Sequence, residues 1–128
     1  MHTIVLSNMG VLYSWGCNDD KALGREGADN FPEVIELPVV VNNIAAGDSH
    51  SVAYSTDLNK VFTWGSYRTI DGKFGNPIEK PTELNKRYWS GLVEKVICGS
   101  NHTIMLSSGY VYTWGNPEFG QIGRYIFN

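Results

Sequence analysis

The stretch His50-Ser-Val-Ala-Tyr-Ser55, followed by Val61-Phe-Thr-Trp64-Gly65, decides the fold because closely related stretches occur twice more in the chain. The first copy runs from His2 to Gly16, and the last runs from His102 to Gly115. The tryptophans of the three copies are 49 and 50 residues apart. A period of roughly 40 to 50 residues built from strands indicates an array such as the blades of a β-propeller.

Each copy predicts a β-hairpin. The first arm is led by histidine, turn-forming residues such as Ser108-Gly109 follow, and the second arm ends in Trp-Gly. Because side chains alternate along a strand, each tryptophan shares one face with the aromatic residue two positions earlier, and small or β-branched residues share the other face. This pattern suits a sheet packed between two neighbouring sheets. The aromatic pairs are Tyr13 with Trp15, Phe62 with Trp64, and Tyr112 with Trp114.

Two further strands are predicted before the second and third histidines, over Val39–Ala46 and Val93–Cys98. Each leads into a short segment that begins with glycine, at Gly47 or Gly99. We expect glycine there to allow a sharp corner between strands. The three histidines recur at one repeat position, so we interpret them as groups that tie the corners by hydrogen bonds, and the repeat's tryptophans and tyrosines as core.

The composition is that of an ordered β-protein, with 42% hydrophobic residues and 14 glycines in 128 positions. No apolar run approaches the roughly 20 residues needed to span a bilayer, and the start lacks a signal-peptide pattern. We therefore expect a cytosolic or nuclear protein without a membrane partner. A net charge of −3 argues against this chain holding DNA phosphates by itself.

Several polar and sulfur-containing residues receive a structural interpretation. Cys17 and Cys98 occupy unrelated repeat positions, so buried thiols are favoured over a disulfide or a metal pair. Asp19-Asp20 is interpreted as a solvated turn, because no further metal ligands lie at suitable spacing. Lys86-Arg87 is interpreted as a surface loop in preference to a nucleic-acid patch. No phosphate-binding loop, zinc spacing or serine nucleophile motif occurs, and we expect no cofactor.

The repeat motif resembles that of the regulator of chromosome condensation family. Its elements are Gly-x-x-His, a hairpin ending in Trp-Gly, and Leu/Ile-Gly-Arg. They occur here as Gly47–His50, Gly10–Asp20, Ala22–Arg25, Tyr112–Gly115 and Gly120–Arg124. The resemblance covers essentially the whole chain and implies an all-β fold, with β-propeller blades made of four-stranded antiparallel sheets, as an incomplete segment of a seven-bladed propeller.

Seven blades of about 50 residues need roughly 350 residues, so this chain supplies about two and a half. The approximate blade boundaries are 1–38, 39–92 and 93–128. Two alternatives follow: a fragment of a longer gene product, which we favour, or a reduced relative that completes its ring by self-assembly. A partial array leaves blade faces and sheet edges uncovered, so we expect it to be less stable than a closed ring and prone to self-associate.

The resemblance further implies guanine nucleotide exchange on the small GTPase Ran, in the nucleus, with chromatin contacts made by parts outside this chain. Such a factor is not an enzyme in the strict sense, because no covalent bond is made or broken. The alternative, from another class, is a propeller that serves as a protein-interaction scaffold without exchange activity, as in ubiquitin-ligase-associated modules.

Two elements of the repeat are candidates for the GTPase contact. In the family the corner residues between glycine and histidine face the GTPase, and Asn101 stands where the family's exchange factor has an acidic residue. The loop Ser66–Gly75 is longer than its counterparts Cys17–Gly24 and Asn116–Gly123, and it corresponds to a projecting wedge in the family. The implied contact residues are Asp48, Ser49, Ser100, Asn101, Tyr67, Arg68, Asp71, Gly72, Lys73 and Phe74.

Overall fold

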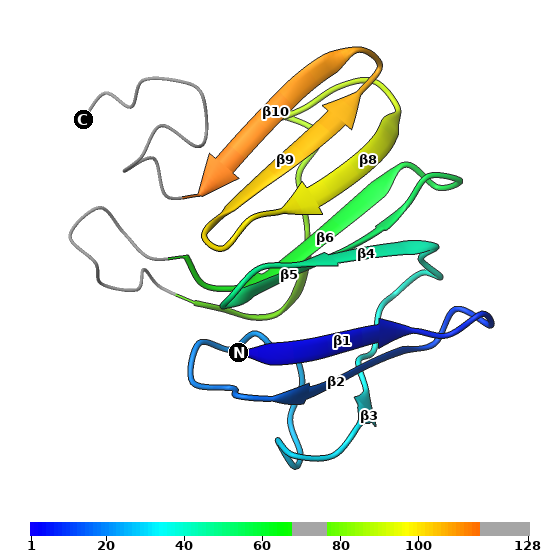
Figure 1. Cartoon of the computed structure of the whole chain (residues 1–128). Coiled ribbons are helices and arrows are strands. Elements are labelled where there is room, and N and C mark those ends of the chain that lie inside the picture. The colour runs from blue at the N-terminus through cyan, green and yellow to red at the C-terminus, as the bar shows by residue number, and fades with distance from the viewer. Residues whose placement is uncertain (68–76, 116–128) are drawn as a thin grey trace.

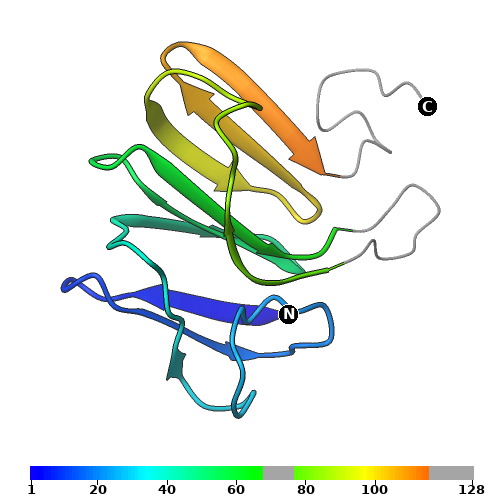
Figure 2. The same ribbon diagram turned by 180° about the vertical axis from the view of Figure 1, so that it is seen from behind.

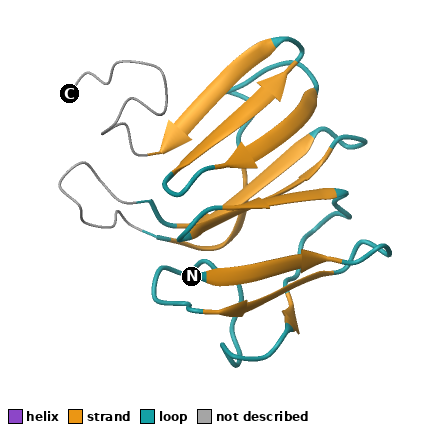
Figure 3. Cartoon of the chain, viewed as in Figure 1, coloured by secondary structure: helices purple, strands orange, loops and turns teal. Residues whose placement is uncertain are grey.

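The computed structural model describes residues 1–67 and 77–115, which form three antiparallel sheets stacked side by side (Figures 1 and 2). The described elements are all strands (Figure 3), and none of the described residues forms a helix able to cross a membrane. The first sheet contains β1 (His2–Leu6), β2 (Leu12–Gly16) and β3 (Glu33–Val34). The second contains β4 (Asn43–Ala46), β5 (His50–Ser55), β6 (Lys60–Gly65) and β7 (Ile78–Glu83). The third contains β8 (Val93–Cys98), β9 (His102–Ser107) and β10 (Tyr110–Gly115).

The three predicted hairpins are confirmed, and their registers are equivalent. The leading histidine of each first arm lies opposite the glycine of Trp-Gly, as in the pair His50 and Gly65. Gly65 has a φ of 93°, and a Cβ there would lie 2.7 Å from the Cα of His50. The glycine of Trp-Gly is therefore required, because the backbone there is left-handed and the neighbouring arm approaches closely.

The predicted division of each sheet into two faces is also confirmed. Phe62 and Trp64 point to the first sheet, where they pack with Leu12. On the opposite face of the second sheet, Val61 packs with Met105 of the third sheet. The core thus consists of two apolar layers between the sheets, and each layer joins the aromatic face of one sheet to the opposite face of the sheet before it.

The tryptophans that end the three hairpins differ in burial. Trp64 is 1% exposed, which confirms it as core. Trp114 is half-buried although it faces the second sheet, and Tyr110, at the turn of the last hairpin, is 67% exposed. Trp15 is also half-buried. Trp15 points away from the second sheet, so its face is covered by no described sheet.

Three local predictions have different outcomes. The strand before His50 and the burial of Cys17 need correction, and the surface position of Lys86-Arg87 is confirmed. The strand expected over Val39–Ala46 begins only at Asn43, because Val41 leaves the sheet to fill the first apolar layer. Cys17 is exposed, so its expected burial was wrong, while Cys98 is half-buried; both thiols are free. Lys86-Arg87 lies at the surface as predicted, with the Lys86 ammonium 3.5 Å above the Trp89 ring.

Candidate functional site at the corner loops

The corner loops gather at one end of the stacked sheets, on the left in Figure 1. They comprise residues 47–49 before β5 and residues 99–101 before β9. Because each leading histidine pairs with the glycine that ends its hairpin, β6 and β10 also end on this side. Tyr67 and Pro77, which border the longer loop, follow β6 and precede β7.

A main-chain hydrogen bond joins the two corners. The N–H of Asp48 donates to the carbonyl of Ser100 at 3.0 Å, and both residues are exposed. Ser49 is only 9% exposed, and its carbonyl accepts a hydrogen bond from the N–H of Ser66 at 2.8 Å. Asn101 is half-buried. The structure therefore presents Asp48 and Ser100 to solvent, whereas Ser49 lies largely inside the corner.

Packing of an imidazole explains the glycine of Gly-x-x-His better than the sharp corner that the sequence suggested. Neither Gly47 nor Gly99 has a positive φ. A Cβ on Gly47 would lie 2.6 Å from Nδ1 of His50, and a Cβ on Gly99 would lie equally close to Nδ1 of His102. Main-chain bonds from Gly47 to His50 and from Gly99 to His102 close the two corners. The glycine of each corner loop thus packs against the imidazole ring of the histidine that follows it.

The histidines connect neighbouring sheets, which confirms a structural role for two of the three. Nε2 of His2 lies 2.6 Å from the hydroxyl of Ser51, and Nε2 of His50 lies 3.2 Å from the hydroxyl of Thr103. Ser51 donates its own proton to the carbonyl of Ala22 at 3.0 Å, so the His2 ring must carry a proton on Nε2. Sequence reasoning missed these partners, although every copy has a hydroxyl residue directly after its histidine.

The electrostatics of these rings disfavour an acid–base role. Burial, with a contribution from the nearby His2 ring, lowers the pKa of His50 to about 4. Burial also lowers the pKa of His2. A general base is most effective when its pKa is near the working pH, so His50 is poorly suited to proton transfer at neutral pH. In the described ranges, no cluster of three or more metal-ligating side chains occurs.

Tyr67 anchors the start of the longer loop to the third sheet. Its hydroxyl lies 3.0 Å from the hydroxyl of Thr103, and its ring centroid lies 4.3 Å from that of His50. Burial raises the pKa of Tyr67 to about 12, which keeps the phenol neutral. The remaining predicted loop residues, Arg68, Asp71, Gly72, Lys73 and Phe74, lie outside the described residues.

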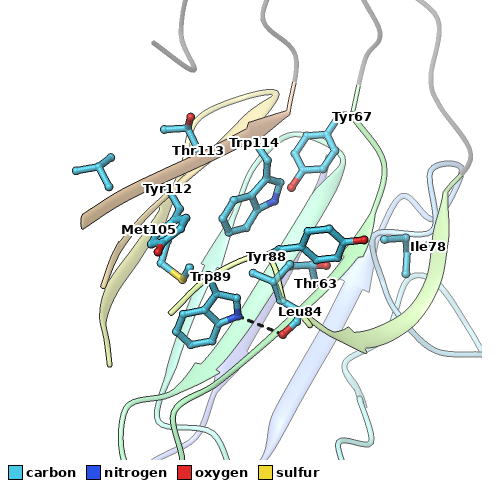
Figure 4. A pocket seen from close by; sticks show the side chains of 11 residues that line it. Thr63, Tyr67, Ile78, Leu84, Tyr88, Trp89, Met105, Tyr112, Thr113 and Trp114 are labelled. Atoms are coloured by element: carbon cyan, nitrogen blue, oxygen red, sulfur yellow. Dashed lines mark hydrogen bonds between the residues drawn. The ribbon is translucent and has the colours of Figure 1, made fainter. Parts of the chain in front are cut away.

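An aromatic cavity of about 510 Å³ lies beside Tyr67, between the second and third sheets (Figure 4). Trp89 and Trp114 line it, and the Trp89 indole donates a hydrogen bond to the carbonyl of Leu84 at 3.2 Å. At the first interface Trp64, the equivalent of Trp114, donates to the carbonyl of Ala22. The residues equivalent to Ala22 in the second copy lie outside the described part of the chain. The largely apolar lining of the cavity beside Tyr67 suits an apolar side chain.

Comparison with known proteins agrees with the fold and the repeat. Residues 9–54 and 93–121 each match a regulator of chromosome condensation (RCC1) repeat. Regulator of chromosome condensation from Homo sapiens is 43% identical over 131 residues, which covers 97% of this chain and 31% of the human protein. The human E3 ubiquitin-protein ligase HERC2 is 33% identical over 96% of this chain, which corresponds to 3% of that ligase.

A solved structure shows the same arrangement of sheets. Prp20p from Saccharomyces cerevisiae, whose crystal structure was described with its binding to Gsp1p and histones, superposes with a TM-score of 0.90. The two are 27% identical, and the match covers 99% of this chain and 33% of Prp20p. The chain thus spans about a third of the length of the human regulator of chromosome condensation and of Prp20p.

The stacked sheets and the repeated corner motif define the class as a segment of a β-propeller. The matched repeats and relatives then place the chain in the regulator of chromosome condensation (RCC1) repeat family.

Proposed function

We propose that this chain is a segment of a guanine nucleotide exchange factor for the small GTPase Ran, acting in the nucleus. The observation that carries the proposal is the pair of exposed corners, Asp48 and Ser100, fixed to each other by a hydrogen bond. The start of the longer loop at Tyr67 contacts the same sheets. Relatives named regulator of chromosome condensation, and the binding of Gsp1p and histones by Prp20p, support this assignment.

Asp48 is the residue of the corners that offers a negative charge to a partner. It is exposed, and the two ion pairs within the described ranges, Arg25–Glu33 and Lys60–Glu83, do not involve it. A lysine or arginine of the GTPase can therefore pair with its carboxylate. Because the partners exclude water on docking, loss of one member of such a pair typically costs about 2 to 5 kcal/mol of binding free energy.

The longer loop is proposed to act as a wedge at the nucleotide site of the GTPase. A GTPase holds its nucleotide with main-chain N–H groups of a glycine-rich loop, one lysine and a magnesium ion. A loop inserted beside these groups displaces the ion, and the nucleotide then dissociates faster. By linkage, such a factor binds the nucleotide-free GTPase most tightly and is released when nucleotide rebinds. We assign the insertion to Arg68, Asp71, Gly72, Lys73 and Phe74.

The test is stopped-flow release of fluorescent GDP from Ran, with this chain and with a full-length form that contains it. Asp48→Ala should raise the concentration of factor needed for half-maximal release by about 30-fold or more, as expected for the loss of at least 2 kcal/mol. Asp57→Ala is the matched control, because Asp57 is an exposed aspartate in the β5–β6 turn at the opposite end of the second sheet. A linker that shortens Asp71-Gly72-Lys73 should preserve binding and abolish acceleration.

A scaffold function is the second candidate, favoured by the 33% identity to HERC2 over 96% of this chain. A scaffold would bind its partner without regard to the nucleotide. If full-length wild type does not accelerate release, or if both variants act like wild type at every concentration, the exchange proposal fails and the scaffold takes its place. The net charge of −3 leads us to assign chromatin contacts to other parts of the protein.

A further inference from the structure

The junction between the first and second sheets is closed by a main-chain carbonyl, that of Ala22. The Ser51 hydroxyl donates to this oxygen at 3.0 Å, and the Trp64 indole N–H donates to it at 2.8 Å. Nε2 of His2 lies 2.6 Å from the same Ser51 hydroxyl. A histidine, a hydroxyl, an acceptor and an indole thus form one network, and the acceptor belongs to the connection that follows β2.

The junction between the second and third sheets repeats the histidine, the hydroxyl and the indole but takes its acceptor from a side chain. Nε2 of His50 lies 3.2 Å from the Thr103 hydroxyl, and the Tyr67 hydroxyl lies 3.0 Å from the same oxygen. The indole nitrogen of Trp114 points toward the Tyr67 hydroxyl (Figure 4). Burial raises the pKa of Tyr67, and hydrogen bonding by the side chains of Thr103 and Trp114 opposes this rise. The Tyr67 oxygen therefore takes the place of the Ala22 carbonyl.

The sequence of the second copy differs from that of the first at both ends of this connection. Tyr67 stands at the position of Asn18, whose side chain accepts a hydrogen bond from within its own connection at 3.2 Å. Arg25 fastens the first connection to β2, because it donates to the hydroxyl and to the carbonyl of Ser14 at 3.1 and 2.7 Å. Its counterpart in the second copy is Asn76. The second copy thus lacks the arginine and has a tyrosine that reaches the next sheet.

The Tyr67 ring and its hydroxyl are held by different neighbours. The ring centroid lies 4.3 Å from that of His50, so the phenol and the imidazole are in contact. The pKa of about 12 keeps the phenol neutral at physiological pH, so its oxygen can both accept and donate a hydrogen bond. His50 belongs to the second sheet and Thr103 to the third, so Tyr67 is fixed to both sheets. The residue that opens the longer loop therefore has a defined position.

We propose that Tyr67 is a positioning residue for nucleotide release, whose hydroxyl fixes the start of the longer loop to the third sheet in place of a main-chain carbonyl. This inference rests on the proposed exchange function. A loop that acts on the nucleotide site of a partner needs a rigid base, because a group held loosely is not kept in its productive geometry. Tyr67 acts through the loop and does not touch the GTPase.

Stopped-flow release of fluorescent GDP from Ran, with the full-length protein, separates positioning from binding. Tyr67→Phe keeps the ring against His50 and removes only the hydroxyl. The maximal release rate at saturating factor should fall about two- to tenfold, as expected for the loss of one hydrogen bond. The concentration of factor needed for half-maximal release should stay at the wild-type value, because no contact with the GTPase is removed.

Tyr112→Phe is the matched control, because it removes a hydroxyl from the same interface between sheets. The Tyr112 hydroxyl accepts a hydrogen bond from the N–H of Ser90 at 3.2 Å, in the connection before β8 and away from the longer loop. Its maximal release rate should equal that of wild type. Circular dichroism and the unfolding midpoint verify that each variant is folded.

The partner hydroxyl provides a second set of variants. Thr103→Val should lower the maximal rate at least as much as Tyr67→Phe does. Thr103→Ser should keep the wild-type rate, since Ser51 has this role at the first junction. The double variant Tyr67→Phe/Thr103→Val should be no slower than Thr103→Val alone, because both changes remove the same bond.

The outcomes separate this role from the exchange function itself. If full-length wild type does not accelerate release, the exchange function fails and the positioning role fails with it. If wild type accelerates release and Tyr67→Phe reaches the same maximal rate, the positioning role alone is overturned. It is also overturned if Tyr67→Phe changes only the half-maximal concentration, which would indicate a GTPase contact, or if Tyr112→Phe or Thr103→Ser is equally slow.

Discussion

The indole N–H of Trp64 donates a hydrogen bond to the carbonyl of Ala22 at 2.8 Å and so fastens the second sheet to the loop that follows the first. The same carbonyl accepts a hydrogen bond from Ser51. Gly24 lies beneath the indole, with a φ of 67°. This arrangement gives a physical reason for the Leu-Gly-Arg element of the repeat, because the tryptophan of the next sheet occupies the space of a side chain at Gly24.

Gly24→Ala should destabilise the chain more than Gly109→Ala does. Both glycines have a positive φ, but a Cβ on Gly24 would lie 2.6 Å from Nε1 of Trp64, whereas a Cβ on Gly109 would meet nothing within 4 Å. We expect about 1 kcal/mol for the backbone strain at either site and about 1 to 3 kcal/mol more at Gly24 for the clash. Urea unfolding measures both. Equal losses would show that the indole does not require the glycine.

Trp64→Ala should lower the free energy of unfolding by about 3 to 5 kcal/mol, because it empties a large volume in the first apolar layer. Trp15→Ala is the matched control, since Trp15 holds the same repeat position but is half-buried. Its loss should be clearly smaller at protein concentrations where the chain is monomeric. An unchanged unfolding midpoint for Trp64→Ala would contradict the assignment of the two faces.

Stability should fall on acidification between pH 6.5 and about pH 4. The pKa of His50 is about 4 in the folded chain because its ring is buried, while the ordinary value is 6.5. Within this window the unfolded chain binds a proton that the folded chain does not, so the free energy of unfolding decreases as the pH falls. His50 accounts for about 3 kcal/mol in total, and His2 acts in the same direction.

Urea unfolding at a series of pH values measures this effect, and His50→Gln provides the control. Glutamine keeps a polar group near Thr103 but does not titrate, so the variant should lose most of the slope between pH 6.5 and 4. A slope in the variant equal to that of wild type would rule out His50 as its origin.

The two free cysteines should differ strongly in reactivity. Cys17 is exposed, whereas Cys98 is half-buried and burial raises the pKa of its thiol to about 11. Because the thiolate is the reactive form, Cys17 should react quickly with a disulfide reagent and Cys98 only slowly. In Cys17→Ser the fast phase should disappear. A persistent fast phase in that variant would mean that Cys98 is reachable in the folded chain.

Threefold repetition made the hairpins and their faces predictable. The spacing from His50 to Trp64 recurs with little change, so one alternation pattern could be checked in three places. Strand β7 offered no such signal, because its sequence is polar and contains Pro81. An edge strand tolerates proline, since one row of its N–H groups is not needed for pairing. The place of β7 at the edge of the second sheet, and not an alternation of apolar and polar side chains, accounts for this strand.

The candidate site was predictable in location but not in detail. The residues between glycine and histidine were identified from the motif, and Asp48 and Ser100 are indeed exposed. Exposure of Ser49 could not be judged, because it depends on a main-chain contact with Ser66. The partners of the histidines were missed for a similar reason: Ser51 and Thr103 lie on a neighbouring sheet, and single-strand alternation does not describe contacts between sheets.

The bond between the corners has a consequence for how binding surfaces on this fold can change. It joins the N–H of Asp48 to the carbonyl of Ser100, so it uses no side-chain atom. Most other residue types could stand at either position without altering the spacing of the corners. The main chain therefore fixes the positions of these two corner residues. The side chain at either position can change to suit another partner while the neighbouring corner stays in place.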